Sequence, residues 1–144
     1  IDPVAVRCAR ANLAAVGGQV HLGDLDAALP TELLGRVDVL VANVPYVPTA
    51  QIDLLPSEAR DHEPRRALDG GSDGLAVLRR VAAAAPDWLA PDGALLVETS
   101  AGQTRRAVAV MRGAGLRARV ARSAALDATA VVADRGTTGQ RVDG

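Results

Sequence analysis

The segment at residues 37–46 reads VDVLVANVPY, and it decides the fold. Its run from Val39 to Ala42 is continuously apolar, which is typical of a parallel strand that is covered on both faces. The turn Asn43-Val44-Pro45-Tyr46 follows directly. Ligands bind at the carboxyl ends of strands in open α/β sheets, so we expect Asn43 at the end of a central strand, beside a binding site.

The chain opens on a predicted helix. Asp2 before Pro3 is a helix-start signal, and apolar residues then recur at helical spacing until Gly17. Cys8 belongs to this apolar series, so we expect it to face the core in a structural role. The first element is therefore an amphipathic helix that ends at a glycine.

The remaining pattern alternates between strands and helices. Before the turn at 43–46 it predicts a short strand at 19–22, a weakly helical crossover at 25–34 broken by Pro30, and the strand at 37–42. After the turn it predicts a flap-like loop with a short helical turn at 49–74, a helix at 75–89, a strand at 94–98 and a helix at 103–112. The chain then ends on strands at 116–121 and 128–133 and a polar tail at 135–144. This order predicts one α/β domain over residues 1–144, with a mainly parallel sheet, helices on both faces and an antiparallel edge hairpin.

The composition excludes several kinds of chemistry. All 16 basic residues are Arg, so a Schiff-base lysine and a P-loop lysine are excluded. One Cys and two His cannot form an internal disulfide, a thiolate zinc cluster or a three-histidine metal site. The net charge of -1 argues against nonspecific binding of nucleic acid. No apolar run reaches the roughly 18 residues of a membrane span and no leader pattern opens the chain, so we expect a cytoplasmic protein.

The turn at residues 43–46 has two interpretations. The first is a stop signal after a buried strand. The second is functional, because the turn resembles the Asn-Pro-Pro-Tyr motif of methyltransferases that act on planar amino or amide nitrogens. Val44 stands where those enzymes usually have Pro, which keeps the carbonyl group but loses one rigid φ angle.

The residue types of this turn suit such a reaction. The lone pair of an amide nitrogen is delocalised, so a site must hold both N–H groups and direct the lone pair at the methyl group. The side-chain carbonyl of Asn43 and the main-chain carbonyl of Val44 can supply the two acceptors. Pro45 stiffens the turn, and Tyr46 offers a flat face to the substrate amide.

Further segments extend the resemblance. Val47-Pro48, RDHEP at 60–64, ALDGGSDGL at 67–75 and LVE at 96–98, together with the turn, resemble the release-factor glutamine N5-methyltransferase family from Asp2 to about Ala133. The resemblance implies a seven-stranded Rossmann-like methyltransferase fold and S-adenosylmethionine as methyl donor. It also implies a peptide-chain release factor as protein partner, methylated at the glutamine of its Gly-Gly-Gln loop.

The same resemblance implies cofactor-binding residues. The family has an Asp near the adenine ring after its third strand, and Asp24 matches that position; Asn43 would also face the cofactor. The family's ribose carboxylate aligns just before Ile1. Asp2 is therefore better interpreted as a helix cap, although a shifted register would bring it to the ribose. No glycine-rich G-x-G-x-x-G turn occurs in the sequence, so we expect a partial domain that lacks the first strands and binds the cofactor weakly.

Two other motifs have simpler explanations. Residues 70–74 match the G-x-S-x-G elbow of hydrolases, but both His precede Ser72, whereas that fold orders its triad Ser, acid, His. Ser72 and Asp73 are better interpreted as caps of the following helix. His62 lies in a charged segment that we interpret as solvated loop, and Trp88 is expected in the core.

Two alternatives to glutamine methylation stay open. A nucleic-acid amino methyltransferase could use the same four residues at 43–46, although it would be expected to present a basic face. The second alternative is a non-catalytic Rossmann-like module, which would not bind S-adenosylmethionine. The sequence does not determine the oligomeric state.

Overall fold

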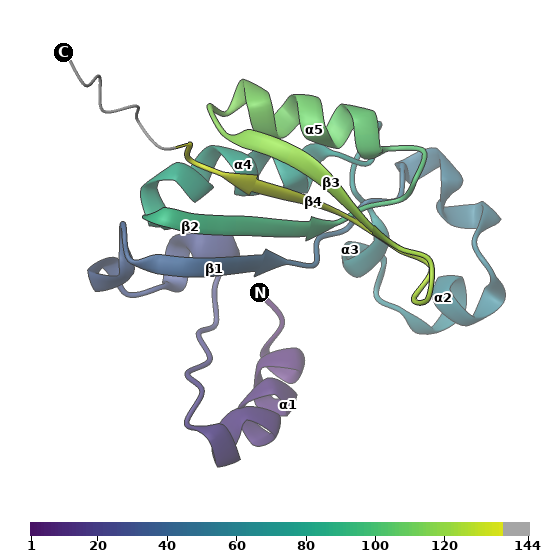
Figure 1. Cartoon of the computed structure of the whole chain (residues 1–144). Coiled ribbons are helices and arrows are strands. Elements are labelled where there is room, and N and C mark those ends of the chain that lie inside the picture. Colours follow the sequence, from purple (N-terminus) through teal and green to yellow (C-terminus); the bar gives the residue numbers. More distant parts are fainter. Residues whose placement is uncertain (137–144) are drawn as a thin grey trace, which may run out of the picture. The chain divides into compact units, whose positions relative to one another are not determined.

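The structure is a computed structural model that describes residues 1–136. The chain divides into two compact units, the first from Ile1 to Leu33 and the second from Leu34 onward (Figure 1). Most of the predicted polar tail at 135–144 lies outside the described residues. No helix within residues 1–136 is long and apolar enough to cross a membrane.

The first unit begins with helix α1 (Pro3–Leu13), followed by the 3-10 turn η1 (Ala14–Val16). Asp2 is its N-cap, and its carboxylate accepts hydrogen bonds from the backbone N–H groups of Val4 at 2.7 Å and Ala5 at 3.4 Å. These N–H groups have no partner inside the helix, so the cap stabilises its first turn. The predicted helix start is confirmed.

Two expectations for the first unit were wrong. Cys8 is exposed, because a helix face is buried only where another element packs on it, and Val6 is the one buried residue of α1. Residues 19–22 form no strand, since a strand requires a hydrogen-bonded neighbour and none pairs with them in residues 1–136. The weakly helical crossover is confirmed as two 3-10 turns, η2 (Leu25–Ala28) and η3 (Thr31–Leu33).

The second unit contains a four-stranded sheet in the order β1-β2-β4-β3 (Figure 1). The strands are β1 (Val37–Ala42), β2 (Leu89–Glu98), β3 (Arg117–Ser123) and β4 (Ala128–Asp134). β1 and β2 are parallel, while β4 pairs antiparallel with both β2 and β3. The α/β class and the antiparallel edge hairpin are confirmed. Among the described strands β1 lies at the edge of the sheet, not in its centre as expected.

Two helices pack on one face of this sheet and on each other, α4 (Ala76–Trp88) and α5 (Thr104–Gly113) (Figure 1). Both follow the predicted ranges closely, and Trp88 is buried as expected. Burial of this apolar face supplies the main stabilisation of the unit. Its core is formed by Leu78, Val81, Ala85 and Trp88 of α4, Ala107 and Met111 of α5, and Leu95, Val97, Val131 and Ala133 of the sheet.

The opposite face of the sheet is open within this unit. Val39 and Val41 point to that face and are 61% and 73% exposed. Their partners on β2, Ala94 and Leu96, are half-buried, whereas Leu95 and Val97 on the helix face are buried. The expectation of a strand covered on both faces, with helices on both sides of the sheet, is therefore wrong for the second unit. An apolar run indicates a strand but not which faces are covered.

Residues 49–74 contain more helix than expected. They form η4 (Thr49–Leu54), α2 (Ser57–His62) and α3 (Arg65–Leu68). Pro56 and Pro64 directly precede α2 and α3. Proline is well tolerated at helix starts because its fixed φ is helical and its missing N–H has no partner there. A parallel bridge between Val47 and Asp69 closes this segment, which we call the flap.

Candidate functional site

The turn at residues 43–46 leaves the carboxyl end of β1, directly after the pairing of Ala42 with Val97. Val44 is buried at 9% exposure and anchors the turn, while Pro45 and Tyr46 are half-buried. Asn43 is exposed, and within residues 34–136 its side chain makes no hydrogen bond. The turn therefore presents an amide with one acceptor and two donors that are open to a ligand.

A buried glutamine holds the far end of this turn. Gln103 is 5% exposed and lies at the start of α5. Its Nε2 donates hydrogen bonds to the carbonyl oxygen of Tyr46 at 2.8 Å and to that of Asp73 at 3.3 Å. Its Oε1 accepts from Ser100 Oγ at 3.0 Å. One side chain thus joins the turn after β1, the loop before α4 and the loop after β2.

The flap returns alongside the residues that follow the turn. Val47 N–H donates to the Leu68 carbonyl at 3.0 Å, and Gly70 N–H donates to the Val47 carbonyl at 2.9 Å. Thr49 N–H donates in turn to the Gly71 carbonyl at 3.0 Å. These three bonds fix the flap's last residues beside residues 47–49.

Asp69 ties the same two segments through its side chain. Its Oδ1 accepts from Thr49 Oγ1 at 2.6 Å and from the Gly71 N–H at 3.0 Å, and Arg65 Nε lies 3.5 Å from its Oδ2. The hydrogen bond from Thr49, followed by that from Gly71, lowers the pKa of Asp69 below its usual range. Both donors favour the charged carboxylate, so Asp69 is ionised at neutral pH.

Asp73 lies just before α4. Its Oδ1 accepts from the Leu75 N–H at 3.1 Å, and the Arg79 guanidinium pairs with both of its carboxylate oxygens. The hydrogen bond from Arg79 is the largest cause that lowers the pKa of Asp73 to about 2. The predicted capping role of Ser72 and Asp73 was wrong: the N-cap of α4 is Leu75, which makes no side-chain cap hydrogen bond, and Asp73 instead contacts the Leu75 N–H and Arg79.

The glycines of this loop allow three backbone segments to meet. A Cβ on Gly74 would lie 2.3 Å from Gln103 Nε2 and 2.3 Å from the Tyr46 carbonyl oxygen. A Cβ on Gly70 would lie 2.7 Å from the Gly74 carbonyl oxygen. Real Cβ atoms do not come this close to a backbone oxygen, so the predicted family segment at 67–75 has a structural basis in its glycines.

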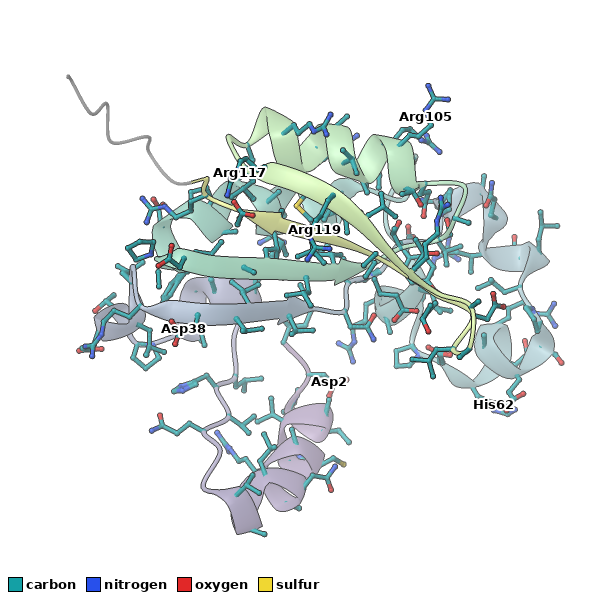
Figure 2. The ribbon with its side chains drawn as sticks, viewed as in Figure 1. Asp2, Asp38, His62, Arg105, Arg117 and Arg119 are labelled. Carbon is teal, nitrogen blue, oxygen red and sulfur yellow. The ribbon has the colours of Figure 1, made fainter. Side chains whose placement is uncertain are left out.

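The two predicted cofactor carboxylates belong to the first unit. Asp24 is exposed at the start of η2, with extended backbone angles. Asp2 caps α1, as its preferred interpretation predicted (Figure 2). An exposed carboxylate such as Asp24 can accept hydrogen bonds from amino and hydroxyl groups, and the Asp2 carboxylate accepts those of the first turn of α1. Asn43 to Tyr46 lie in the second unit.

His62 lies at the end of α2, exposed and away from the sheet (Figure 2). It belongs to the charged surface of the flap, as predicted. Within residues 1–136 no three His, Cys, Asp or Glu side chains gather in a way that could hold a metal ion.

Sequence reasoning identified the turn but missed the residues that hold it. Gln103 was predicted only as a helix start, and Asp69 only as part of a family segment. Each acts through partners far along the chain: Gln103 contacts residues 57 and 30 positions away, and Asp69 contacts one 20 positions away.

An α/β sheet with an Asn-x-Pro-Tyr turn at the carboxyl end of a parallel strand defines a Rossmann-like methyltransferase fold. The chain is 41% identical to a release factor glutamine methyltransferase of Geobacter sulfurreducens over 116 residues, which cover 79% of the chain and 40% of that relative. It is 42% identical to a release factor glutamine methyltransferase of Rhodospirillum rubrum over 120 residues, 81% of the chain and 36% of that relative.

A ribosomal protein uL3 glutamine methyltransferase of Bordetella pertussis is 45% identical over 98 residues, 65% of the chain and 32% of that relative. No family model matches the chain. The chain belongs to the release factor glutamine methyltransferase family, and it spans about two fifths of the length of the first curated relatives that it matches.

Proposed function

We propose that the chain takes part in methyl transfer from S-adenosylmethionine to the side-chain amide nitrogen of a glutamine in a protein. The observation that carries this proposal is the placement of Asn43. Its amide is exposed at the carboxyl end of β1, on a turn held by buried Val44 at one end and by Gln103 at the other. The names of the relatives support glutamine as the methylated residue.

In this proposal the turn contributes to catalysis by orienting the substrate amide. Asn43 Oδ1 and the Val44 carbonyl accept the two N–H hydrogens of the substrate amide and so fix the plane of that amide. Its nitrogen lone pair, perpendicular to the plane, then faces the methyl group that S-adenosylmethionine supplies as an electrophilic carbon. The half-buried ring of Tyr46 offers a flat surface that keeps the amide in place. When bound, S-adenosylmethionine would supply the methyl group: the substrate nitrogen would form the new carbon–nitrogen bond as the methyl carbon–sulfur bond breaks, S-adenosylhomocysteine would leave, and one N–H proton would pass to solvent. No covalent enzyme intermediate is required.

Asp24 is the proposed partner of the adenine group of the cofactor. Its exposed carboxylate accepts hydrogen bonds, which suits an exocyclic amino group. Asn43 is the proposed residue that faces both the cofactor and the substrate. A ribose contact from Asp2 has less support, because the Asp2 carboxylate caps α1.

The proposed protein substrate is a peptide-chain release factor. Relatives from Geobacter sulfurreducens and Rhodospirillum rubrum are named for that activity, and the Bordetella pertussis relative is named for ribosomal protein uL3. Either substrate would be met in the cytoplasm. Both names specify glutamine as the methylated residue, so the two candidate substrates are distinguished by experiment.

The proposal is tested with S-adenosylmethionine that carries an isotope-labelled methyl group. The chain is incubated separately with a release factor, with uL3 and with RNA, and the products are mapped by mass spectrometry. We expect one label on the release-factor glutamine and none on RNA. Label on RNA alone, or none on any of the three, would contradict the proposal. Titration calorimetry with S-adenosylmethionine separates an inactive enzyme from a module that does not bind the cofactor.

A further inference from the structure

Gln103 occupies a position whose chemistry only a primary amide satisfies. Both hydrogens of its Nε2 point at carbonyl oxygens, of Tyr46 at 2.8 Å and of Asp73 at 3.3 Å, and its Oε1 accepts from Ser100 Oγ. Glutamic acid in the same place would direct a carboxylate oxygen, which only accepts hydrogen bonds, at the carbonyl oxygens of Tyr46 and Asp73, which are acceptors too. Methionine would fill a similar volume with no hydrogen bond. With 5% exposure, the side chain cannot exchange these partners for water.

The Tyr46 carbonyl is the last group of the turn at residues 43–46. The turn is fixed at its first end by the pairing of Ala42 with Val97 in the sheet. At its second end, Gln103 holds the Tyr46 carbonyl and the Leu68 carbonyl holds the Val47 N–H. The peptide between Tyr46 and Val47 is planar, so these two bonds fix its orientation. A turn with both ends fixed has few ways to move its middle residues.

We propose that Gln103 is a positioning residue for methyl transfer: by holding the Tyr46 carbonyl, it sets the direction in which Asn43 and the Val44 carbonyl meet the substrate amide. This inference rests on the proposed function. Gln103 does not touch the substrate. It acts through the turn, and its loss would leave the acceptors present but misdirected.

The loop before α4 belongs to the same arrangement. The Asp73 carbonyl shares Gln103 Nε2 with Tyr46, and Gly74 leaves the space in which they meet. The position of the helix start, and of the flap that precedes it, is therefore coupled to the position of the turn. A displacement of about 1 Å of an orienting group can lower a rate by as much as about a hundredfold, so a loss of hydrogen bonds at Gln103 is expected to lower the rate strongly.

The test uses Gln103→Met and Gln103→Glu in the full chain, with Gln51→Met as the matched control, because Gln51 is an exposed glutamine on η4. The chain has a single Tyr. Labelling the Tyr carbonyl with 13C and Val with 15N therefore gives one NMR signal, from the peptide between Tyr46 and Val47. Methyl transfer to a release-factor glutamine and the Kd for S-adenosylmethionine are measured on the same samples.

We expect both Gln103 variants to shift the Tyr46 carbonyl signal and to lower kcat by roughly 10- to 100-fold, with a Kd for S-adenosylmethionine within about threefold of the unaltered chain. Gln51→Met should leave all three values unchanged. An unmoved signal or an unaltered kcat in Gln103→Met would overturn the inference, as would a parallel loss of cofactor affinity and kcat. If the unaltered chain transfers no methyl group, the proposed function fails first, before any substitution is compared.

Discussion

Gly74 packs so closely on Tyr46 that a Cβ at position 74 would lie 2.3 Å from the Tyr46 carbonyl oxygen. Gly74 also has a φ of 75°, which L side chains rarely adopt. We therefore predict that Gly74→Ala destabilises the protein by about 2 kcal/mol or more, because it combines backbone strain with displacement of the turn. Urea denaturation measures the change in the free energy of unfolding.

Gly113→Ala is the matched control for this substitution. Gly113 ends α5, and a Cβ there would meet nothing within 4 Å. The same change at this position should stabilise the protein by about 0.5 kcal/mol, since alanine loses less backbone entropy than glycine in a helix. Equal effects of the two substitutions would show that the close approach at Gly74 does not matter.

The ion pair between Asp73 and Arg79 predicts a specific acid titration. The pKa of Asp73 falls from 3.8 to about 2, chiefly through its hydrogen bond from Arg79. A lowered pKa means that the contribution of these contacts to stability is fully present above the ordinary value and is lost as the pH falls through the folded value. The ion pair should thus persist at pH 4 and weaken near pH 2. In Arg79→Met, NMR titration should find the pKa of Asp73 closer to its ordinary value; an unchanged pKa would contradict the role of Arg79.

The flap depends on the bond between Thr49 and Asp69. Thr49→Val removes the 2.6 Å hydrogen bond that most lowers the pKa of Asp69, so that pKa should rise toward its ordinary value. Backbone amides of residues 68–71 should then exchange with solvent faster, because residues 47–49 are held less firmly. Hydrogen exchange followed by mass spectrometry checks this. Exchange that accelerates equally in α5 would instead indicate general destabilisation.

The open face of β1 predicts concentration-dependent association. Val39 and Val41 are exposed beside an edge whose backbone groups have no strand partner within the described residues. Such edges pair readily with other chains. Val41→Lys should lower association in sedimentation equilibrium without loss of folding, whereas Val97→Lys, at a position 2% exposed, should unfold the protein. A chain that is monomeric at all concentrations without any substitution would contradict this prediction.

Local pattern was sufficient to predict most elements of the second unit. The ranges of β1, α4 and α5 followed from apolar spacing, and the hairpin of β3 and β4 followed from two strands with no helix between them. The flap was predicted as a loop with one short helical turn, and its further helices were missed because prolines such as Pro56 and Pro64 are frequent in loops as well as at helix starts.

Burial and long-range contacts could not be predicted in this way. The exposure of Val39 and of Cys8 depends on which elements pack against them, and the apolar character of a residue does not specify those elements. The turn at residues 43–46 was identifiable because its residues are adjacent in the chain. Gln103 was not, because its two carbonyl partners lie 57 and 30 residues away.

The rate of methyl transfer by Asn43→Ala tests the central claim most directly. Asn12→Ala is the matched control, because Asn12 is the other Asn of the chain and is exposed on α1. With a release factor as substrate, Asn43→Ala should lose at least about a hundredfold in kcat while its Kd for S-adenosylmethionine stays within about threefold, and Asn12→Ala should match the unaltered chain. Methyl transfer by Asn43→Ala at the rate of Asn12→Ala, or an equal loss of cofactor binding, would contradict the orienting role of Asn43.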